Sequence, residues 1–142
     1  MTNDLVLNIS VTIHAPQSKV WSALIDPDQI KKYLFGTETK TDWKVGSPIT
    51  FSGEWEGKPY VDKGTILQIE KGKVLKYNYW SSFSGNEDKP ENYANVTYTL
   101  EDHHGNTVFH LTQDGIKTKE ARDHSEQNWR MVLNSLKDLL EK

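Results

Sequence analysis

Five histidines are the first side chains to consider for chemistry, because imidazole can bind a metal or transfer a proton near neutral pH. Their predicted positions do not converge. His103 and His104 fall in a predicted hairpin turn, and His14 and His110 fall on outward positions of predicted strands. His124 follows a glutamate by four positions and can share a helix face with it, but a metal site needs three or four ligands. We therefore assign no metal ligand and no cofactor.

Machinery for nucleophilic or acid–base catalysis is not visible in the sequence either. The chain has no cysteine, which excludes a thiolate nucleophile, a thiolate metal cluster and a disulfide. The serines lie mostly in predicted loops without an assignable histidine and carboxylate, and neither a nucleophile elbow nor a phosphate-binding loop is present. Four carboxylates are expected in solvent, on outward strand positions or in turns: Asp42, Glu54, Glu56 and Asp62. No catalytic residue is assigned, and binding is favoured over catalysis.

The aromatic side chains indicate binding chemistry instead. They make up 11% of a chain that is only 35% hydrophobic, so rings must supply much of the buried area. Alternation predicts one inward face, formed by Ile49, Phe51, Trp55, Leu75, Tyr77, Tyr79, Val96, Tyr98, Leu100, Phe109, Leu111 and Gln113. Tyr77 and Gln113 are polar members of this face and need a partner. They could orient a ligand's carbonyl or hydroxyl, bond to the backbone, or lie near the open end of the sheet. The face therefore predicts either a binding cavity or a filled core.

A first strand and two short helices precede these segments. Residues 5–13 alternate between apolar and polar side chains, the period of a strand with one buried face. Ser18 is a candidate cap for a short helix that carries Trp21 inward. Asp26 and Pro27 end that helix, and PDQIKKYLFG then predicts one or two further helical turns.

The middle of the chain predicts antiparallel strands joined by turns. The strand-like segments are residues 38–44, 48–56, 60–69, 74–80, 92–101 and 107–113. Most are separated by short polar connectors with glycine, which favour hairpins. The longest connector, SSFSGNEDKPEN, predicts a surface loop.

The last segment predicts a long helix that begins near Thr118. One apolar stripe runs along it, formed by Trp129, Val132, Leu133, Leu136 and Leu140. A sheet with one apolar face and a single amphipathic helix must cover each other, which predicts an α+β fold. Nothing divides the chain, so residues 1–142 are predicted to form one domain.

Charge and hydropathy limit the classes of partner that the chain is expected to bind and the cellular compartment in which it is expected. The net charge of −3 gives no basic surface for a nucleic acid. No apolar stretch reaches the ~18 to 20 residues that span a bilayer, so no membrane insertion is expected. The first residues lack the basic start and apolar run of a secretion signal, which predicts a cytoplasmic protein.

Together these elements resemble the helix-grip fold of the START-like, or SRPBCC, superfamily, which is also called Bet v 1-like. APQSKVWSALIDPDQIKKYLFG is similar to the opening of that family, and TDWKVGSPITFSGEWEG is similar to its Val-Gly stretch before a strand. GTILQIEKGKVLKYNYW resembles its central hairpin, while VTYTLEDHHGNTVFHLTQDG and NWRMVLNSLKDLL resemble its closing hairpin and helix. These stretches cover nearly the whole chain. The branch it resembles is that of homologues of the activator of the heat-shock-protein-90 ATPase.

The resemblance implies a curved antiparallel sheet wrapped around the long C-terminal helix, with a deep cavity between them. Across the superfamily such cavities hold lipids, hormones, polyketides or other apolar molecules. The candidate lining residues here are Tyr33, Leu34, Phe35, Phe51, Trp55, Tyr77, Tyr79, Tyr98, Phe109, Leu111, Gln113, Trp129, Val132 and Leu133. Tyr33 and Leu34 stand where many relatives have a tryptophan pair, and Gln113 stands where many have histidine, which bears on the choice of ligand.

Three functions follow as hypotheses. The favoured one is a binder of a small hydrophobic molecule such as a lipid, a flavonoid or a polyketide-like compound. The second is a stress-response interaction protein that regulates the heat-shock-protein-90 chaperone through its outer surface. The third, which the resemblance allows, is a cyclase-like or aromatase-like enzyme, although the acid and base that such an enzyme needs are not visible.

Overall fold

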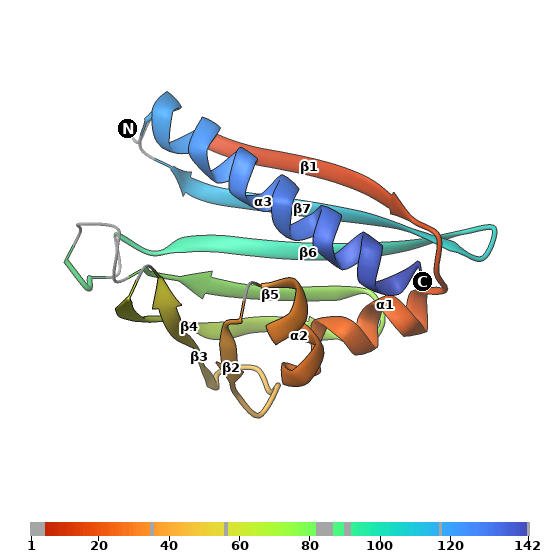
Figure 1. The fold of residues 1–142 in the computed structure, drawn as a ribbon, viewed down its shortest axis with the longest axis horizontal. Coiled ribbons are helices and arrows are strands. Elements are labelled where there is room, and N and C mark those ends of the chain that lie inside the picture. Colours follow the sequence, from red (N-terminus) through yellow and green to blue (C-terminus); the bar gives the residue numbers. More distant parts are fainter. Residues whose placement is uncertain are drawn as a thin grey trace.

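The computed structural model describes residues 5–34, 36–55, 57–81, 87–89, 92–116 and 118–141, with the side chain of Trp55 excepted. Within these residues a seven-stranded sheet is covered on one face by three helices (Figure 1). The elements are β1 (Leu5–Ile13), α1 (Gln17–Leu24), α2 (Pro27–Tyr33), β2 (Glu38–Lys40), β3 (Pro48–Trp55), β4 (Lys58–Glu70), β5 (Val74–Tyr79), β6 (Ala94–His103), β7 (Asn106–Ile116) and α3 (Lys119–Leu140).

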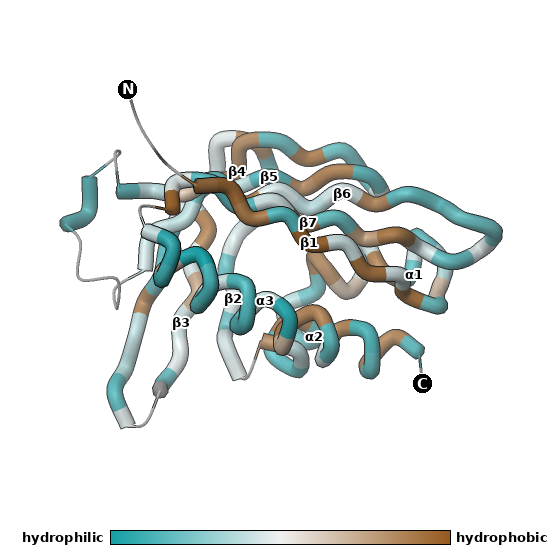
Figure 2. The backbone as a smooth tube through the Cα atoms, turned by 90° about the horizontal axis from the view of Figure 1, so that it is seen from above, coloured by the Kyte–Doolittle hydropathy of each residue, from teal (hydrophilic) through white to brown (hydrophobic). Residues whose placement is uncertain are grey.

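The sheet is antiparallel throughout and runs in the order β1-β7-β6-β5-β4-β3-β2. Neighbours in the sheet follow one another along the chain except where β1 joins β7, with Ile9 opposite Leu111. Figure 2 shows the strands on one side of the molecule and the helices on the other, with β2 and β3 curving toward the helices. This is the predicted α+β helix-grip arrangement, so the fold expected from the sequence is confirmed.

The strand predicted over residues 38–44 is shorter than expected. It pairs with β3 as predicted, with Thr39 opposite Phe51, but β2 ends at Lys40. Beyond it Trp43 adopts a left-handed φ of 61°, and its backbone N–H donates to Thr41 Oγ1 at 3.4 Å. A left-handed residue breaks the extended backbone that a strand requires. The alternation at residues 39, 41 and 43 therefore belongs only in part to a strand.

Side-chain caps begin two of the three helices. Asp26 accepts a hydrogen bond from the backbone N–H of Asp28 at the start of α2, and Thr118 accepts one from Ala121 at the start of α3. The predicted cap Ser18 is wrong, because α1 begins at Gln17 with Pro16 at its N-cap position and has no side-chain cap.

Helix α3 lies on the concave face and is tied to the edge strand β1. Its predicted stripe is buried at Val132, Leu133, Leu136 and Leu140 and half-buried at Trp129. Hydrogen bonds at both ends fasten it: Arg122 Nε donates to Val6 O at 3.4 Å, Lys137 Nζ donates to Thr12 O at 3.2 Å, and Glu141 Oε2 accepts from His14 N at 2.8 Å. Helix α2 packs beside it, against β2. No helix in the described part of the chain is long and apolar enough to cross a membrane.

Candidate functional site

A continuous row of aromatic rings crosses the concave face of the sheet. Phe51 on β3 lies 5.6 Å from Tyr77 on β5, which lies 5.7 Å from Tyr98 on β6, which in turn lies 5.3 Å from Phe109 on β7, measured between ring centroids. Trp129 of α3 meets Tyr98 edge-on at 6.0 Å. Phe51, Tyr77, Tyr98 and Phe109 of the predicted inward face therefore lie together, and their rings touch one another in tilted and edge-to-face contacts that aromatic side chains prefer.

A pair of hydroxyl groups interrupts this apolar row. Tyr77 Oη and Tyr98 Oη are 2.8 Å apart and form a hydrogen bond in which either can be the donor. Both side chains are nearly inaccessible to water. Burial raises the pKa of both hydroxyls well above its ordinary value, because a tyrosinate would lose its hydration there. Both tyrosines are thus neutral hydrogen-bonding groups over the ordinary pH range.

A second polar contact joins the sheet to α3. Trp129 Nε1 donates to Gln113 Oε1 at 2.7 Å, and both side chains are half-buried. Gln113 Oε1 therefore accepts from a side chain of the helix, whereas a bond to the backbone was one of the interpretations that the sequence left open. The contact orients the indole ring that lies against Tyr98.

The remaining predicted cavity residues occupy different parts of the interior. Leu111, Val132 and Leu133 are buried, and Tyr33 is buried with its hydroxyl donating to Ala23 O at 3.1 Å. Burial raises the pKa of Tyr33 strongly. Leu34 is half-buried at the end of α2. Phe35 and the side chain of Trp55 lie outside the described residues.

Asp62 corrects an expectation from the sequence. It was predicted on an outward strand position, but it is buried with 8% of its surface exposed, and its Oδ2 accepts a hydrogen bond from Tyr79 Oη at 2.6 Å. Burial, assisted by this carboxylate, raises the pKa of Tyr79 strongly. Asp62 shares the parity of Gly64 and Ile66 along β4, so alternation was the signal that could have placed it inward.

Thr39 of β2 and Thr37, which immediately precedes β2, complete this polar end of the concave face. Thr37 Oγ1 and Tyr60 Oη lie 2.6 Å apart and bond across Gly53, where a Cβ would approach the Tyr60 hydroxyl to 2.7 Å. Thr39 is 4% exposed, and its Oγ1 has no hydrogen-bond partner among the described residues. Neither Thr39 nor Tyr60 was identified as a site residue from the sequence, because a threonine or a tyrosine on a strand by itself predicts packing only.

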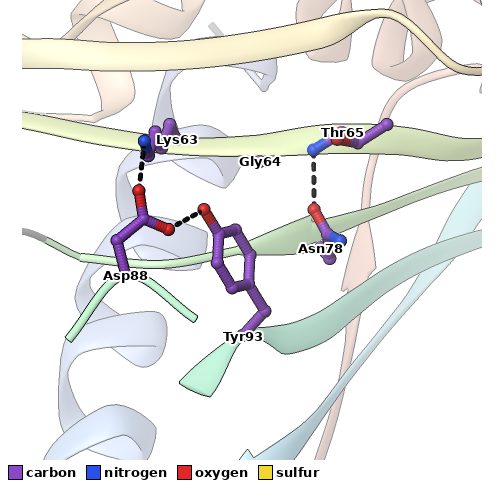
Figure 3. A pocket seen from close by; sticks show the side chains of 6 residues that line it. All are labelled: Lys63, Gly64, Thr65, Asn78, Asp88 and Tyr93. Atoms are coloured by element: carbon purple, nitrogen blue, oxygen red, sulfur yellow. Dashed lines mark hydrogen bonds and ion pairs between the residues drawn. The ribbon is translucent and has the colours of Figure 1, made fainter. Parts of the chain in front are cut away.

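Two hollows open on the outside of the molecule, away from the ring row. The larger, of about 410 Å³, is lined by Lys63, Gly64, Thr65, Asn78, Asp88 and Tyr93 (Figure 3). Its polar groups are already paired: Asp88 bonds to Lys63 and to Tyr93, and Asn78 Oδ1 accepts from Thr65 N at 2.6 Å. The second, of about 320 Å³, lies at the β2–β3 connection. Their described linings include none of the predicted cavity residues.

The histidines remain apart from one another, with His103 and His104 the exception at a ring separation of 4.9 Å. His110 bonds to Ser10 on β1 and to Glu101 on β6, on the outer side of the sheet. Within the described ranges no three histidine, aspartate or glutamate side chains gather closely enough to hold a metal ion.

Comparison with solved structures places this architecture among known proteins. The chain is 46% identical to protein ChR145 from Cytophaga hutchinsonii, over 96% of this chain and 94% of that one, with a TM-score of 0.84. Protein MLL2253 from Mesorhizobium loti is 23% identical, over 96% of each chain, with a TM-score of 0.81. Ara h 8.0201 shares the fold at 11% identity, over 97% and 98% of the chains, with a TM-score of 0.79.

Comparison of the sequence with known proteins and protein families gave a match to a family. None of the curated proteins compared with the chain matches it. A family profile does match, over residues 14–141, and it describes activator of Hsp90 ATPase homolog 1-like proteins. This range includes both short helices, the ring row and all of α3. The chain therefore belongs to the family of activator of Hsp90 ATPase homolog 1-like proteins, a branch of the START-like superfamily.

Proposed function

We propose that the chain binds a small hydrophobic or aromatic molecule between the concave face of the sheet and helices α2 and α3, and releases it unchanged. The observation that carries this proposal is the hydroxyl pair of Tyr77 and Tyr98 in the middle of the ring row. Only one of its two protons can lie in the bond between the oxygens. The other remains available to donate to a ligand, in surroundings where an unused donor is unfavourable.

The surrounding rings supply the apolar part of such a site. Tyr98 is in contact with Tyr77, Phe109 and Trp129, so a flat molecule that replaces one of these contacts meets ring faces and edges on several sides. The rings touch one another, and binding therefore requires at least one of them to turn. Trp129 is the member best able to do so, because it is half-buried and belongs to the helix rather than to the sheet.

The test is a screen of uncharged aromatic and lipid-like compounds by thermal unfolding and by nuclear magnetic resonance. A ligand present at 100 times its dissociation constant stabilises the fold by about 2.7 kcal/mol, which raises the melting temperature by several degrees. The indole N–H resonance of Trp129 should shift on binding. Trp80 is the internal control, because it follows the inward Tyr79 and therefore faces the opposite side of the sheet, near Lys63.

The proposal fails if no compound raises the melting temperature and none moves the Trp129 resonance. The family name offers the second candidate, stimulation of the Hsp90 ATPase. The large exposed apolar side chains among the described residues are Val6 on β1, Val45 in the β2–β3 connection, Val61 and Leu67 on β4, and Met131 on α3. A chain that binds no ligand but accelerates that ATPase would replace our proposal with the chaperone function.

A further inference from the structure

The hydroxyl of Thr39 lies at the β2 edge of the concave face and lacks a hydrogen-bond partner among the described residues. Its Oγ1 is the one buried side-chain oxygen or nitrogen without a hydrogen-bond partner in the described part of the chain. The nearby polar groups are already engaged, since Thr37 bonds to Tyr60 and Tyr79 bonds to Asp62. Buried hydroxyls are almost always paired, so an unpaired one indicates a missing partner.

Strand register gives this hydroxyl its neighbours. Thr39 on β2 is directly opposite Phe51 on β3, and Phe51 is directly opposite Asp62 on β4. Residues opposite one another in adjacent strands point to the same face, so the three form a row on the concave side. All three are buried, at 4%, 8% and 8% exposure. Phe51 also touches Tyr77 and Tyr79, which connects this row to the ring row.

The side chains of Thr39, Phe51 and Asp62 together favour one kind of ligand group. A hydroxyl such as that of Thr39 can both donate and accept a hydrogen bond, which suits another hydroxyl. The ring of Phe51 beside it suits an aromatic carbon skeleton. The carboxylate of Asp62 on the far side of that ring repels an anion, so a carboxylic acid is disfavoured at the same place.

We propose that Thr39, Phe51 and Asp62 form the polar end of the ligand site and receive the hydroxyl group of a neutral phenolic compound. This inference rests on the proposed function, since it names the class of ligand that the same interior takes. Thr39 exchanges a hydrogen bond with the phenol, Phe51 packs on its ring, and Asp62 excludes acidic analogues. Burial and the Asp62 carboxylate raise the pKa of Tyr79, which keeps that hydroxyl protonated as the donor to Asp62.

The experiment compares three probes of one size: 2-naphthol, naphthalene and 2-naphthoate. Affinities are measured by calorimetry for the wild type, for Thr39→Val, which replaces the hydroxyl with a methyl group, and for Thr39→Ser, which keeps it. Thr107→Val is the matched control, because Thr107 is also buried but its Oγ1 already donates to Ala15 O at 2.9 Å. Ratios between probes are compared, so that changes in overall stability cancel.

We expect the affinity ratio of 2-naphthol to naphthalene to fall roughly fivefold in Thr39→Val, about the contribution of one neutral hydrogen bond. Thr39→Ser and Thr107→Val should keep the wild-type ratio. Asp62→Asn, which retains an oxygen to accept from Tyr79, should raise the affinity for 2-naphthoate while changing that for naphthalene little.

Two results overturn the inference and differ in what they say of the proposed function. If all three probes bind and the ratio is the same in wild type and Thr39→Val, then Thr39 holds a structural water alone, while ligand binding stands. If none of the probes binds, both this inference and the ligand-binding function fail for aromatic compounds. A fall in the ratio in Thr107→Val equal to that in Thr39→Val would likewise overturn the assignment to Thr39.

Discussion

Tyr77 and Tyr98 show how two polar atoms are accommodated within an apolar layer. Each hydroxyl is buried and each is the hydrogen-bond partner of the other, at 2.8 Å. Removal of one hydroxyl leaves the second without its partner, whereas removal of both leaves only rings. The pair is therefore an energetic unit rather than two independent contributions.

Tyr77→Phe and Tyr98→Phe should each lower the free energy of unfolding by about 1 to 3 kcal/mol, and the double variant should lose clearly less than the sum. Urea unfolding of the four proteins measures this. Tyr93→Phe is the control, because its hydroxyl bonds to the exposed Asp88 and its loss should change stability by about 0.5 kcal/mol or less. Additive losses would show that the two hydroxyls do not depend on each other.

The burial of Asp62 marks the limit of what single residues reveal in the sequence. Tyr77 and Gln113 were identified because they are polar members of an otherwise apolar pattern. Asp62 obeys the same alternation, but a carboxylate is rarely buried without a partner, so solvent was the better expectation. Its partner Tyr79 lies 17 positions away on the next strand. Only the pairing of β4 with β5 brings the two together.

Thr118 tests the contribution of a helix terminus. Its hydroxyl oxygen accepts from the backbone N–H of Ala121 at 3.0 Å, which satisfies one of the free donors at the start of α3. Thr118→Ala should lower the free energy of unfolding by about 1 kcal/mol. Lys119→Ala, at the first helical position, removes no cap and serves as the control. Equal stability of Thr118→Ala and the wild type would show that water replaces the cap without loss.

Local sequence signals were sufficient to predict most helices and strands. They were not sufficient to predict which distant strands pair. The cap at Thr118 and the break at Asp26 and Pro27 depend on adjacent residues, so the start of α3 and the boundary between α1 and α2 were predicted closely, whereas the start of α1 was not. The end of β2 depends on the left-handed backbone of Trp43, which no propensity indicates. The pairing of β1 with β7 joins residues about a hundred positions apart and became predictable only through the resemblance of the whole chain.

The pH dependence of stability belongs to the molecule as a whole. Three buried tyrosines, Tyr33, Tyr77 and Tyr98, and the half-buried Tyr79 have a pKa raised, mainly by desolvation, above the value near 10 of the unfolded chain. Above pH 10 the unfolded state therefore loses protons that the folded state retains, and stability falls as pH rises. Their contribution is complete below that pH.

We expect the free energy of unfolding to fall above pH 10 by about 1.4 kcal/mol per pH unit for each tyrosine that remains protonated in the fold. Urea unfolding at a series of alkaline pH values measures the slope. The Tyr77→Phe, Tyr98→Phe double variant should show a smaller slope, because two of the groups are absent. An unchanged slope in that variant would locate the effect elsewhere.

The sequence predicted which helices and strands enclose the interior, but it did not predict how closely the side chains fill that interior. The order of elements and the fold class were predicted and confirmed, while the position predicted for Asp62 on β4 was wrong. Contact between rings depends on side-chain rotamers and on the curvature of the sheet, which no periodicity encodes. The contacts of Tyr98 with Tyr77, Phe109 and Trp129 could therefore be learned only from the three-dimensional arrangement.

The fastening of α3 to β1 has a kinetic consequence. Bonds near both ends of the helix, from Arg122 and Lys137 to backbone carbonyls and from His14 to Glu141, must break together before that side can open. Helix α2 is only seven residues long and rests on the three-residue strand β2. A ligand should therefore enter and leave beside α2. Its residence time should be governed by how often this short helix moves away from the sheet.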